Sequence, residues 1–324
     1  MKKHIFTKGL FSLCVFLACG WVSVKGQDVP VKEASLLYEA GAVNAEGSMW
    51  IPKTQELYWI DIEKGIFNIL NPVNKHNRAY PLGQRVGTFV PEKSGGVLVA
   101  LQDGIYHLDF KTSKLSFLTK ADYDPKISRF NDGKCDPDGR FWVGSMSLNG
   151  KKNAAALYCY DSKGKLNKML DTVSLSNGIV WTADKKTMYF IDTPTMCVQE
   201  FDYDNSTGKI KFKRIAVRIT GEFSAGHPDG MAIDSKGMLW IAQWNGSCVK
   251  CFNPHSGKML MKIHVPAPRV SSCTFGGKNM DILYITTASQ GLTKEELKKY
   301  PHSGSIFWVK PGARGVNPNY YQKK

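Results

Sequence analysis

Beyond its first 27 residues the sequence has no long hydrophobic run. No later stretch reaches the ~20 apolar residues that a membrane-spanning helix requires, so the mature chain is not expected to insert stably into a membrane. Helical patterning is also scarce, and only residues 294–299 predict a turn or two of helix. The apolar fraction of 43% is nevertheless sufficient for a substantial core. These features favour a globular fold built from strands.

Motifs for a soft metal are also lacking. Cys248 and Cys251 have CxxC spacing, but no second CxxC completes a zinc site. Both lie in a probable strand, where residues three apart point to opposite faces. The cysteines after residue 27 are even in number, which permits disulfides in an oxidising compartment. We expect most of them to be buried free thiols. They are Cys135, Cys159, Cys197, Cys248, Cys251 and Cys273.

Acidic residues are fewer than basic ones, with 28 Asp and Glu against 43 Lys and Arg, so the formal charge is +15. The lysines are scattered, and neither a basic helix nor a stacked aromatic platform accompanies them. Nucleic acid is therefore not predicted as a partner. A solvated cationic surface, which could help attract acidic substrates, is the favoured interpretation.

Residues 1–26 have the pattern of a secretory signal peptide. Two lysines precede an apolar run over residues 10–24, and Val24-Lys25-Gly26 puts small residues at the minus-three and minus-one positions of a cleavage site. We therefore expect an exported protein, periplasmic or secreted. One alternative is an uncleaved anchor, although the run is short and interrupted by Gly20. Another is a lipoprotein acylated at Cys19.

Short apolar strands recur through the rest of the chain, each entered through a turn rich in Asp, Gly, Lys or Asn. Successive strands are anchored 39 to 51 residues apart, by Trp59, Leu98, Trp142, Tyr189, Trp240 and Tyr284. Repeats of this length with several strands each are typical of a propeller, and hairpins would complete four-stranded blades. We predict an all-β, six-bladed β-propeller over residues 27–324 as a single domain. To close the ring, a strand near residues 35–39 should join the sheet that contains residues 305–309.

In four of the six repeats, an oxygen-bearing side chain occupies nearly the same position relative to the anchor residue, which we call its phase. Innermost strands line the channel of a propeller, so residues of equal phase meet near its axis. The four lie 11 to 13 residues before their anchors and have a glycine close by; they are Glu46, Asn131, Asn177 and Asp229. Gly87 and Cys273 take this place in the other two repeats. Asn and Asp are also good turn formers, but their common phase favours a shared site.

The stretch SRFNDGKCDPDGRFWVGSM, residues 128–146, contains two turn-forming groups in close succession. The second, Asp136-Pro137-Asp138-Gly139, is expected to join two strands. The first, Asn131-Asp132-Gly133, is expected to bring Asn131 and Arg129 to the channel mouth. Pairing of Arg129 with a structural carboxylate is the alternative for that residue.

Carboxylate and amide oxygens without a nearby His or Cys suit a hard divalent cation. Ca²⁺ fits best, with Mg²⁺, Mn²⁺ or Zn²⁺ as alternatives. Few protein ligands leave coordination positions open, which is the basis of metal-assisted hydrolysis. A purely structural channel ion is the competing hypothesis.

At these residues the chain resembles the SMP-30/gluconolactonase/regucalcin family over nearly its whole mature length. The motifs that carry the likeness are Glu46-Gly47-Ser48-Met49-Trp50, Arg129-Phe130-Asn131-Asp132-Gly133-Lys134, Ser176-Asn177-Gly178, Pro228-Asp229-Gly230-Met231, Ser271-Ser272-Cys273-Thr274-Phe275-Gly276-Gly277 and Gly304-Ser305-Ile306-Phe307. The resemblance implies a six-bladed propeller that hydrolyses sugar lactones, such as gluconolactone, with one divalent ion in its channel.

The resemblance also implies residue roles. Glu46, Asn177 and Asp229 match the family's metal ligands, and Asp229 matches the proposed general base. Arg129 and Asn131 match substrate contacts. Asn149 stands where some animal members have a substrate-binding glutamate, so it is also expected to bind substrate, and the change from glutamate leaves the particular sugar open.

These roles imply that a metal-bound water attacks the lactone carbonyl while Asp229 accepts its proton. Two other functions stay open. One is a non-enzymatic Ca²⁺-binding propeller, since such folds host many functions. The other is hydrolysis of a different ester, such as an aromatic lactone or a phosphotriester. Oligomeric state is not predicted.

Overall fold

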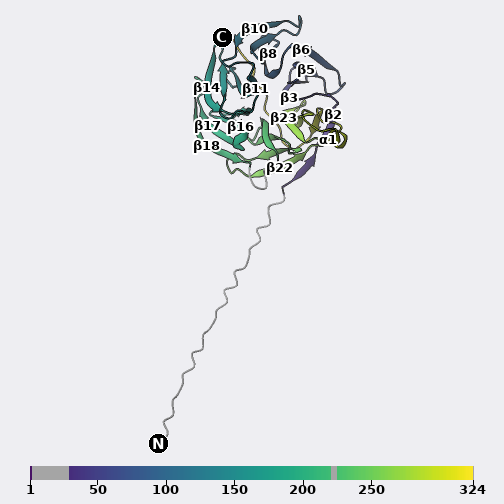
Figure 1. Cartoon of the computed structure of the whole chain (residues 1–324), viewed down its shortest axis with the longest axis vertical. Helices are drawn as coiled ribbons and strands as arrows, with labels where there is room; N and C mark the ends of the chain where they lie inside the picture. The colour runs from purple at the N-terminus through teal and green to yellow at the C-terminus, as the bar shows by residue number, and fades with distance from the viewer. Residues whose placement is uncertain (2–28, 220–224, 324) are drawn as a thin grey trace.

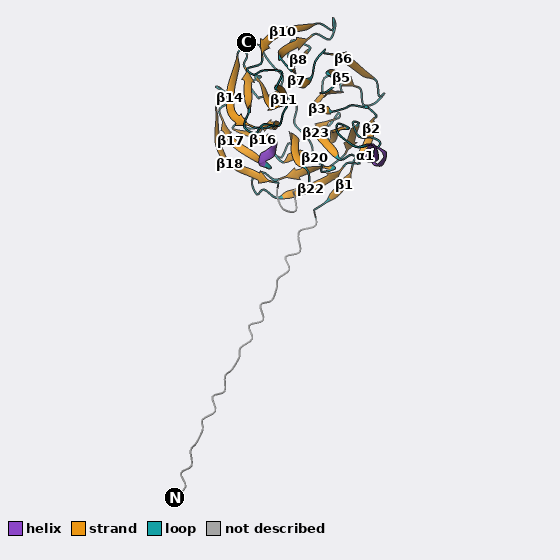
Figure 2. Ribbon diagram, in the orientation of Figure 1, coloured by secondary structure: helices purple, strands orange, loops and turns teal. Residues whose placement is uncertain are grey.

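The computed structural model describes residues 29–219 and 225–323, together with Met1. Six β-sheets surround a central axis as the blades of a propeller (Figures 1 and 2). The predicted six-bladed, all-β fold is therefore confirmed. The predicted signal peptide, apart from Met1, lies outside the described residues, as does Cys19.

Each blade contains four consecutive strands ordered from the channel outward, except at the ring closure. The first two blades comprise β3 (Ala45–Ile51), β4 (Glu56–Asp61), β5 (Ile66–Leu70) and β6 (Asn77–Pro81), then β7 (Val86–Pro91), β8 (Val97–Leu101), β9 (Gly104–Leu108) and β10 (Leu115–Lys120). The next two comprise β11 (Ser128–Cys135), β12 (Phe141–Ser147), β13 (Ala155–Tyr160) and β14 (Leu166–Val173), then β15 (Ser176–Trp181), β16 (Thr187–Asp192), β17 (Cys197–Tyr203) and β18 (Ile210–Arg218).

The fifth blade comprises β19 (His227–Ile233), β20 (Leu239–Trp244), β21 (Cys248–Phe252) and β22 (Met259–His264). The sixth comprises β23 (Arg269–Gly276), β24 (Ile282–Ala288), β25 (Ile306–Val309) and β2 (Ser35–Tyr38). Helical structure among the described residues is limited to α1 (Lys294–Lys299), as predicted, and the 3₁₀ turn η1 (Thr193–Thr195). No helix in this part of the chain has the length and apolar character needed to cross a bilayer.

The two ends of the chain close the ring. β2 pairs antiparallel with β25, with Leu36 opposite Phe307, which confirms the predicted closure. A second short strand, β1 (Val31–Glu33), pairs parallel with β22 and adds a fifth strand to its blade; this strand was not predicted. Both pairings cover edges that would otherwise expose unpaired backbone groups.

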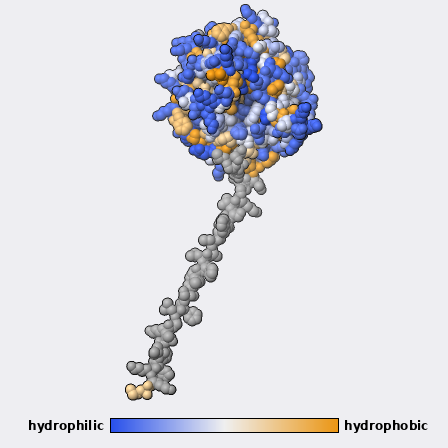
Figure 3. Space-filling view, in the orientation of Figure 1, coloured by the Kyte–Doolittle hydropathy of each residue, from blue (hydrophilic) through white to orange (hydrophobic). Residues whose placement is uncertain are grey.

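The core is divided into six wedges, one between each pair of neighbouring blades. Trp142, for example, is fully buried between the third and fourth blades. The six cysteines after residue 27 are buried and free, as expected for most of them. The surface seen in Figure 3 is mainly hydrophilic, with scattered apolar residues.

The innermost strand of every blade has a register shift near its first residues. The register of each with the second strand of its blade shifts near its channel-side residues, for instance between Glu46 and Met49 in β3 and between Phe130 and Gly133 in β11. Such bulges turn a side chain away from the regular alternation of a strand. The Asn131-Asp132-Gly133 group is therefore part of a bulged strand and not a turn, a correction to the sequence-based interpretation. The Asp136–Gly139 turn does join β11 to β12.

Candidate functional site

A pocket of about 880 Å³ opens where the innermost strands begin. Five residues predicted from the sequence line it, and they come from four different blades: Glu46, Arg129, Asn131, Asn177 and Asp229. Asn149 does not line it. That residue is exposed after β12 and accepts a hydrogen bond from Ser147 Oγ, whereas Met146 lines the pocket at this side.

A continuous series of hydrogen bonds connects the polar side chains that the third and fourth blades contribute to the pocket. Arg129 Nη1 donates to Asn131 Oδ1 (2.6 Å), and Asn131 Nδ2 donates to Asn177 Oδ1 (2.9 Å). Asn177 Nδ2 then donates to Thr193 Oγ1 (2.6 Å), whose hydroxyl donates to the carbonyl of Pro228 (2.7 Å). Because every donor determines the next acceptor, both amides have a defined orientation.

Arg129 is buried at the base of this chain. It also donates to the carbonyl of Phe130 (2.9 Å). No carboxylate of the described residues forms an ion pair with it, so the structure does not support the structural ion pair considered as its alternative role. Its charge acts instead on the buried acids of the pocket.

Three buried acidic side chains interact in the channel. Burial raises the pKa of Glu46 to about 8, and the charge of Asp132 contributes to the increase. Burial raises the pKa of Asp229 well above its usual range, with further contributions from Glu46 and Asp132. Arg129 opposes both increases. Among the described residues, Asp132 Oδ2 has no hydrogen-bond partner.

This donor set fits a hard cation. Glu46 and Asp229 supply carboxylate oxygens, and the hydrogen bond from Asn177 Nδ2 to Thr193 leaves the amide oxygen on the side of Asn131. No cluster of three or more His, Cys, Asp or Glu side chains suited to a metal occurs among the described residues. With Glu46 and Asp229, the amide oxygen of Asn177 would supply a third donor. A divalent ion would stabilise the ionised form of both acids and so oppose the burial and the repulsion that raise their pKa values.

Several lining residues were not predicted from the sequence as site residues. Thr193 follows β16 in η1, and Arg269 begins β23. The position of Thr193, four residues after the anchor Tyr189, could have identified it as a pocket residue. No such position in the repeat identifies Arg269. Trp244 and His227 also line the pocket, and His227 is exposed.

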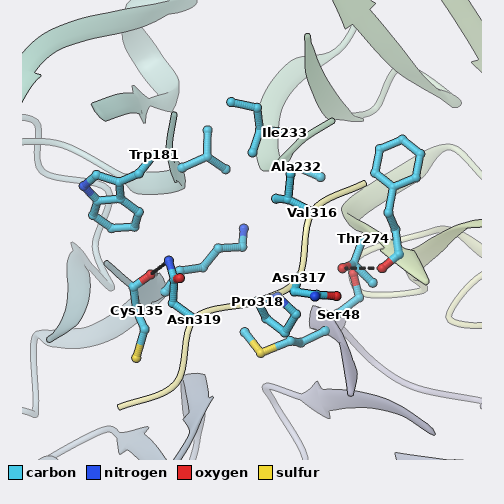
Figure 4. Close-up of a pocket in the computed structure, with 14 residues that line it drawn as sticks. Ser48, Cys135, Trp181, Ala232, Ile233, Thr274, Val316, Asn317, Pro318 and Asn319 are labelled. Atoms are coloured by element: carbon cyan, nitrogen blue, oxygen red, sulfur yellow. Dashed lines mark hydrogen bonds between the residues drawn. The ribbon is translucent and has the colours of Figure 1, made fainter. Parts of the chain in front are cut away.

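A smaller cavity of about 90 Å³ lies farther along the innermost strands, where the C-terminal segment crosses beneath them (Figure 4). Residues 316–319 line one side of it. Asn319 Nδ2 donates to the carbonyl of Cys135 (3.2 Å), and Lys134 Nζ donates to that of Met231 (2.7 Å). The C-terminal segment therefore covers the far ends of the innermost strands that carry the acids, on the side of the smaller cavity.

Comparison with protein families gives a match to the SMP-30/Gluconolactonase/LRE-like region over residues 44–289. A Bacillus subtilis (strain 168) protein named "Putative sugar lactone lactonase YvrE" is 35% identical over 88% of this chain and 97% of its own. Regucalcin of Danio rerio is 36% identical over 85% of this chain and 94% of its own.

Among solved structures, a calcium-binding protein, regucalcin, from Agrobacterium tumefaciens str. C58 superposes with a TM-score of 0.85. The alignment covers 90% of this chain and 99% of that one at 24% identity. This likeness supports the fold.

Proposed function

The chain belongs to the SMP-30/gluconolactonase/LRE-like family, and on this premise we propose that it is a metal-dependent lactonase that opens sugar lactones. One observation carries the proposal. Polar side chains of four blades, predicted separately, line a single pocket in which buried carboxylates lie beside a buried guanidinium. The name of the Bacillus subtilis relative, a sugar lactone lactonase, supports the substrate class.

Glu46, Asn177 and Asp229 would hold the divalent ion, and their oxygen donors favour Ca²⁺ over softer metals. The bound ion would act as a Lewis acid toward the lactone carbonyl and would lower the pKa of water in the pocket. The hydrogen bond from Asn177 to Thr193 keeps the amide oxygen available for this role.

Arg129 and Asn131 would orient the lactone. The guanidinium has N–H groups beyond the two contacts made by Nη1, and these can stabilise the negative charge that develops on the carbonyl oxygen. As the oxygen of water bonds to the carbonyl carbon, Asp229 accepts the proton. The ring C–O bond then breaks, the leaving oxygen takes that proton, and the hydroxy acid is released.

Asp229→Asn tests this assignment because it removes the base and one anionic ligand with little change in volume. Lactone opening by the Ca²⁺-loaded protein, followed with a pH indicator, should fall by at least about a thousandfold, given the combined loss of a base and a metal ligand. Exposed Asp171→Asn is the matched control and should retain activity.

A panel of sugar lactones, aromatic lactones and phosphotriesters would then define the ester. A metal-loaded wild-type protein that opens no ester, with Asp229→Asn changing only thermal stability, would refute the enzyme and favour a non-enzymatic Ca²⁺-binding role.

A further inference from the structure

Three neighbours contact the half-buried side chain of Arg269 in the lining of the pocket. Its guanidinium carbon lies 5.2 Å from the centre of the Trp244 ring, and Nε donates to Asn245 Oδ1 (3.2 Å). Nη2 donates to the carbonyl of Gly291 (3.1 Å). A Cβ at position 291 would lie 2.7 Å from Nη1, so a side chain there would displace the guanidinium from this position. The guanidinium is thus positioned by contacts on several sides before any ligand binds.

None of these partners carries a negative charge. Within the described part of the chain, Arg269 forms no ion pair, although its charge is a minor contribution to the lowered pKa of Glu296, after hydrogen bonds from Thr293. Two of the five guanidinium N–H groups have the hydrogen bonds given above, so others are left to contact a ligand. An arginine fixed by neutral groups retains its charge for an incoming anion, and a carboxylate or phosphate can accept two of its hydrogen bonds at once.

The charges of the pocket also favour an anion. Its lining includes two acids, Glu46 and Asp229, and two arginines, Arg129 and Arg269. A divalent ion held by the two acids, as in the proposed function, leaves the positive charge in excess. Four of the 43 basic residues and none of the 28 acidic ones lie in residues 1–26, so residues 27–324 have a formal charge of +11. Such a field raises the local concentration of acidic ligands.

The pocket is large enough for a substrate that reaches from the acids to Arg269. Its volume of about 880 Å³ lies within the roughly 300–1,000 Å³ typical of sites for drug-sized ligands. A bare aldonolactone would leave much of this space to water. A substituent that extends outward from the lactone ring would fill the space between Arg129 and Arg269.

We propose that the pocket selects acidic lactones, in which a carboxylate or phosphate group away from the ring pairs with Arg269 while the ring contacts Arg129 and Asn131. This inference rests on the proposed lactonase function and specifies its substrate class. The competing role for Arg269 is a structural one, in which it only ties the turn after Trp244 to the loop at Gly291.

Kinetics with matched lactones provide the first test. Glucono-1,4-lactone is compared with glucaro-1,4-lactone, which adds a carboxylate, and glucono-1,5-lactone with its 6-phosphate, after subtraction of spontaneous opening. Wild-type kcat/KM should be higher for the acidic member of at least one pair. Arg269→Met should lower the acidic-to-neutral ratio about tenfold or more, as expected for the loss of a charge-assisted hydrogen bond, and Arg269→Lys should fall between. A preference in only one pair identifies the acidic group.

Arg78→Met is the control for net charge. Arg78 is exposed on β6, where it pairs with Glu56, so its removal lowers the charge equally without altering the pocket. Its acidic-to-neutral ratio should equal that of the wild type. Equal ratios in wild type and Arg269→Met, with only the melting temperature lowered, would overturn the proposal and support the structural role.

Binding without turnover separates this inference from the lactonase function. Calorimetry should detect tighter binding of glucarate or glucose 6-phosphate than of glucose, and Arg269→Met should abolish the difference. If no lactone is opened but this difference is present, the lactonase fails and the anion site stands. If lactones are opened and neither anion is preferred in binding or kinetics, the anion site fails and the lactonase stands.

Discussion

Asn131 Nδ2 donates to Asn177 Oδ1 across 2.9 Å and thereby joins the third and fourth blades inside the pocket. The two side chains come from bulges at the same level of β11 and β15. Their contact makes a proposed substrate residue the neighbour of a proposed metal ligand, so the orientation of one amide depends on that of the other.

Thr193→Val should weaken metal binding through this contact. Without the hydroxyl, Asn177 Nδ2 loses its acceptor, and the buried donor costs about 1–3 kcal/mol unless the amide turns its oxygen away from the metal. We expect roughly tenfold or greater loss of Ca²⁺ affinity, measured by calorimetry, together with a lower melting temperature.

Thr88→Val is the matched control for the Thr193 variant, because Thr88 is buried and donates to the carbonyl of Gly133 outside the pocket lining. It should lower the melting temperature while preserving Ca²⁺ affinity. Equal affinity losses in the two variants would argue against a role for Thr193 in positioning Asn177.

The stability of metal-depleted protein should fall as pH rises. The pKa of Glu46 is raised from 4.5 to about 8 in the folded chain, so the unfolded chain releases its proton first. Folding stability is therefore retained below about pH 4.5 and lost progressively up to about pH 8, by on the order of 1 kcal/mol per pH unit. Denaturant titrations in EDTA would measure this slope.

Saturating Ca²⁺ should reduce the slope, because the ion binds the ionised acids of the native state and stabilises it by mass action. Glu46→Gln should make it shallower in EDTA, since the amide does not titrate while Asp229, whose pKa is also raised by burial, still contributes. A slope unchanged by either treatment would show that other groups control the pH dependence.

Gly87→Ala should disturb the strand that carries Arg129 and Asn131. A Cβ at position 87 would lie 2.3 Å from the carbonyl oxygen of Phe130, so β7 and β11 would have to separate. We expect a loss of about 1–3 kcal/mol in the free energy of unfolding and reduced lactone opening.

Gly150→Ala serves as the comparison for Gly87→Ala. A Cβ at position 150 meets no atom within 4 Å, although its positive φ of 71° carries a backbone cost of its own. It should lower stability without the accompanying loss of activity. Normal activity in Gly87→Ala would mean that the bulge of β11 tolerates the displacement.

Export predicts a defined mature terminus. Cleavage after Gly26 would leave Gln27 as the first residue, and β1 begins only at Val31, so no described strand would be lost. Intact-mass measurement of protein recovered outside the cytoplasm should give this terminus. A lipid-modified chain that begins at Cys19 would support the lipoprotein alternative, and a full-length chain would support the uncleaved anchor.

The sequence was sufficient to predict the blades because each repeat carries its own anchor and turns. The phase of Glu46, Asn131, Asn177 and Asp229 also predicted their convergence, since symmetry relates equal positions around an axis. At the equivalent position of the second blade, glycine replaces the oxygen-bearing residue, because β7 approaches the carbonyl of Phe130 too closely at Gly87 for a side chain.

Other features depend on contacts between distant segments and leave no repeat in the sequence. Arg269 is positioned by Trp244 and Gly291, and β1 is positioned by β22. The Asn131-Asp132-Gly133 group has turn-forming residues, but the pairing of β11 with β12 holds it in a strand. Sequence reasoning therefore found what the repeats specify and missed what tertiary contacts add.

The pairing of Leu36 with Phe307 has a consequence for biosynthesis. During translation, β2 emerges from the ribosome long before its partner β25 has been made, so the sixth sheet cannot assemble co-translationally. Contacts this far apart in sequence are slow to form. A premature stop codon before residue 306 would remove β25 and leave β2 without its partner strand, so the ring would stay open.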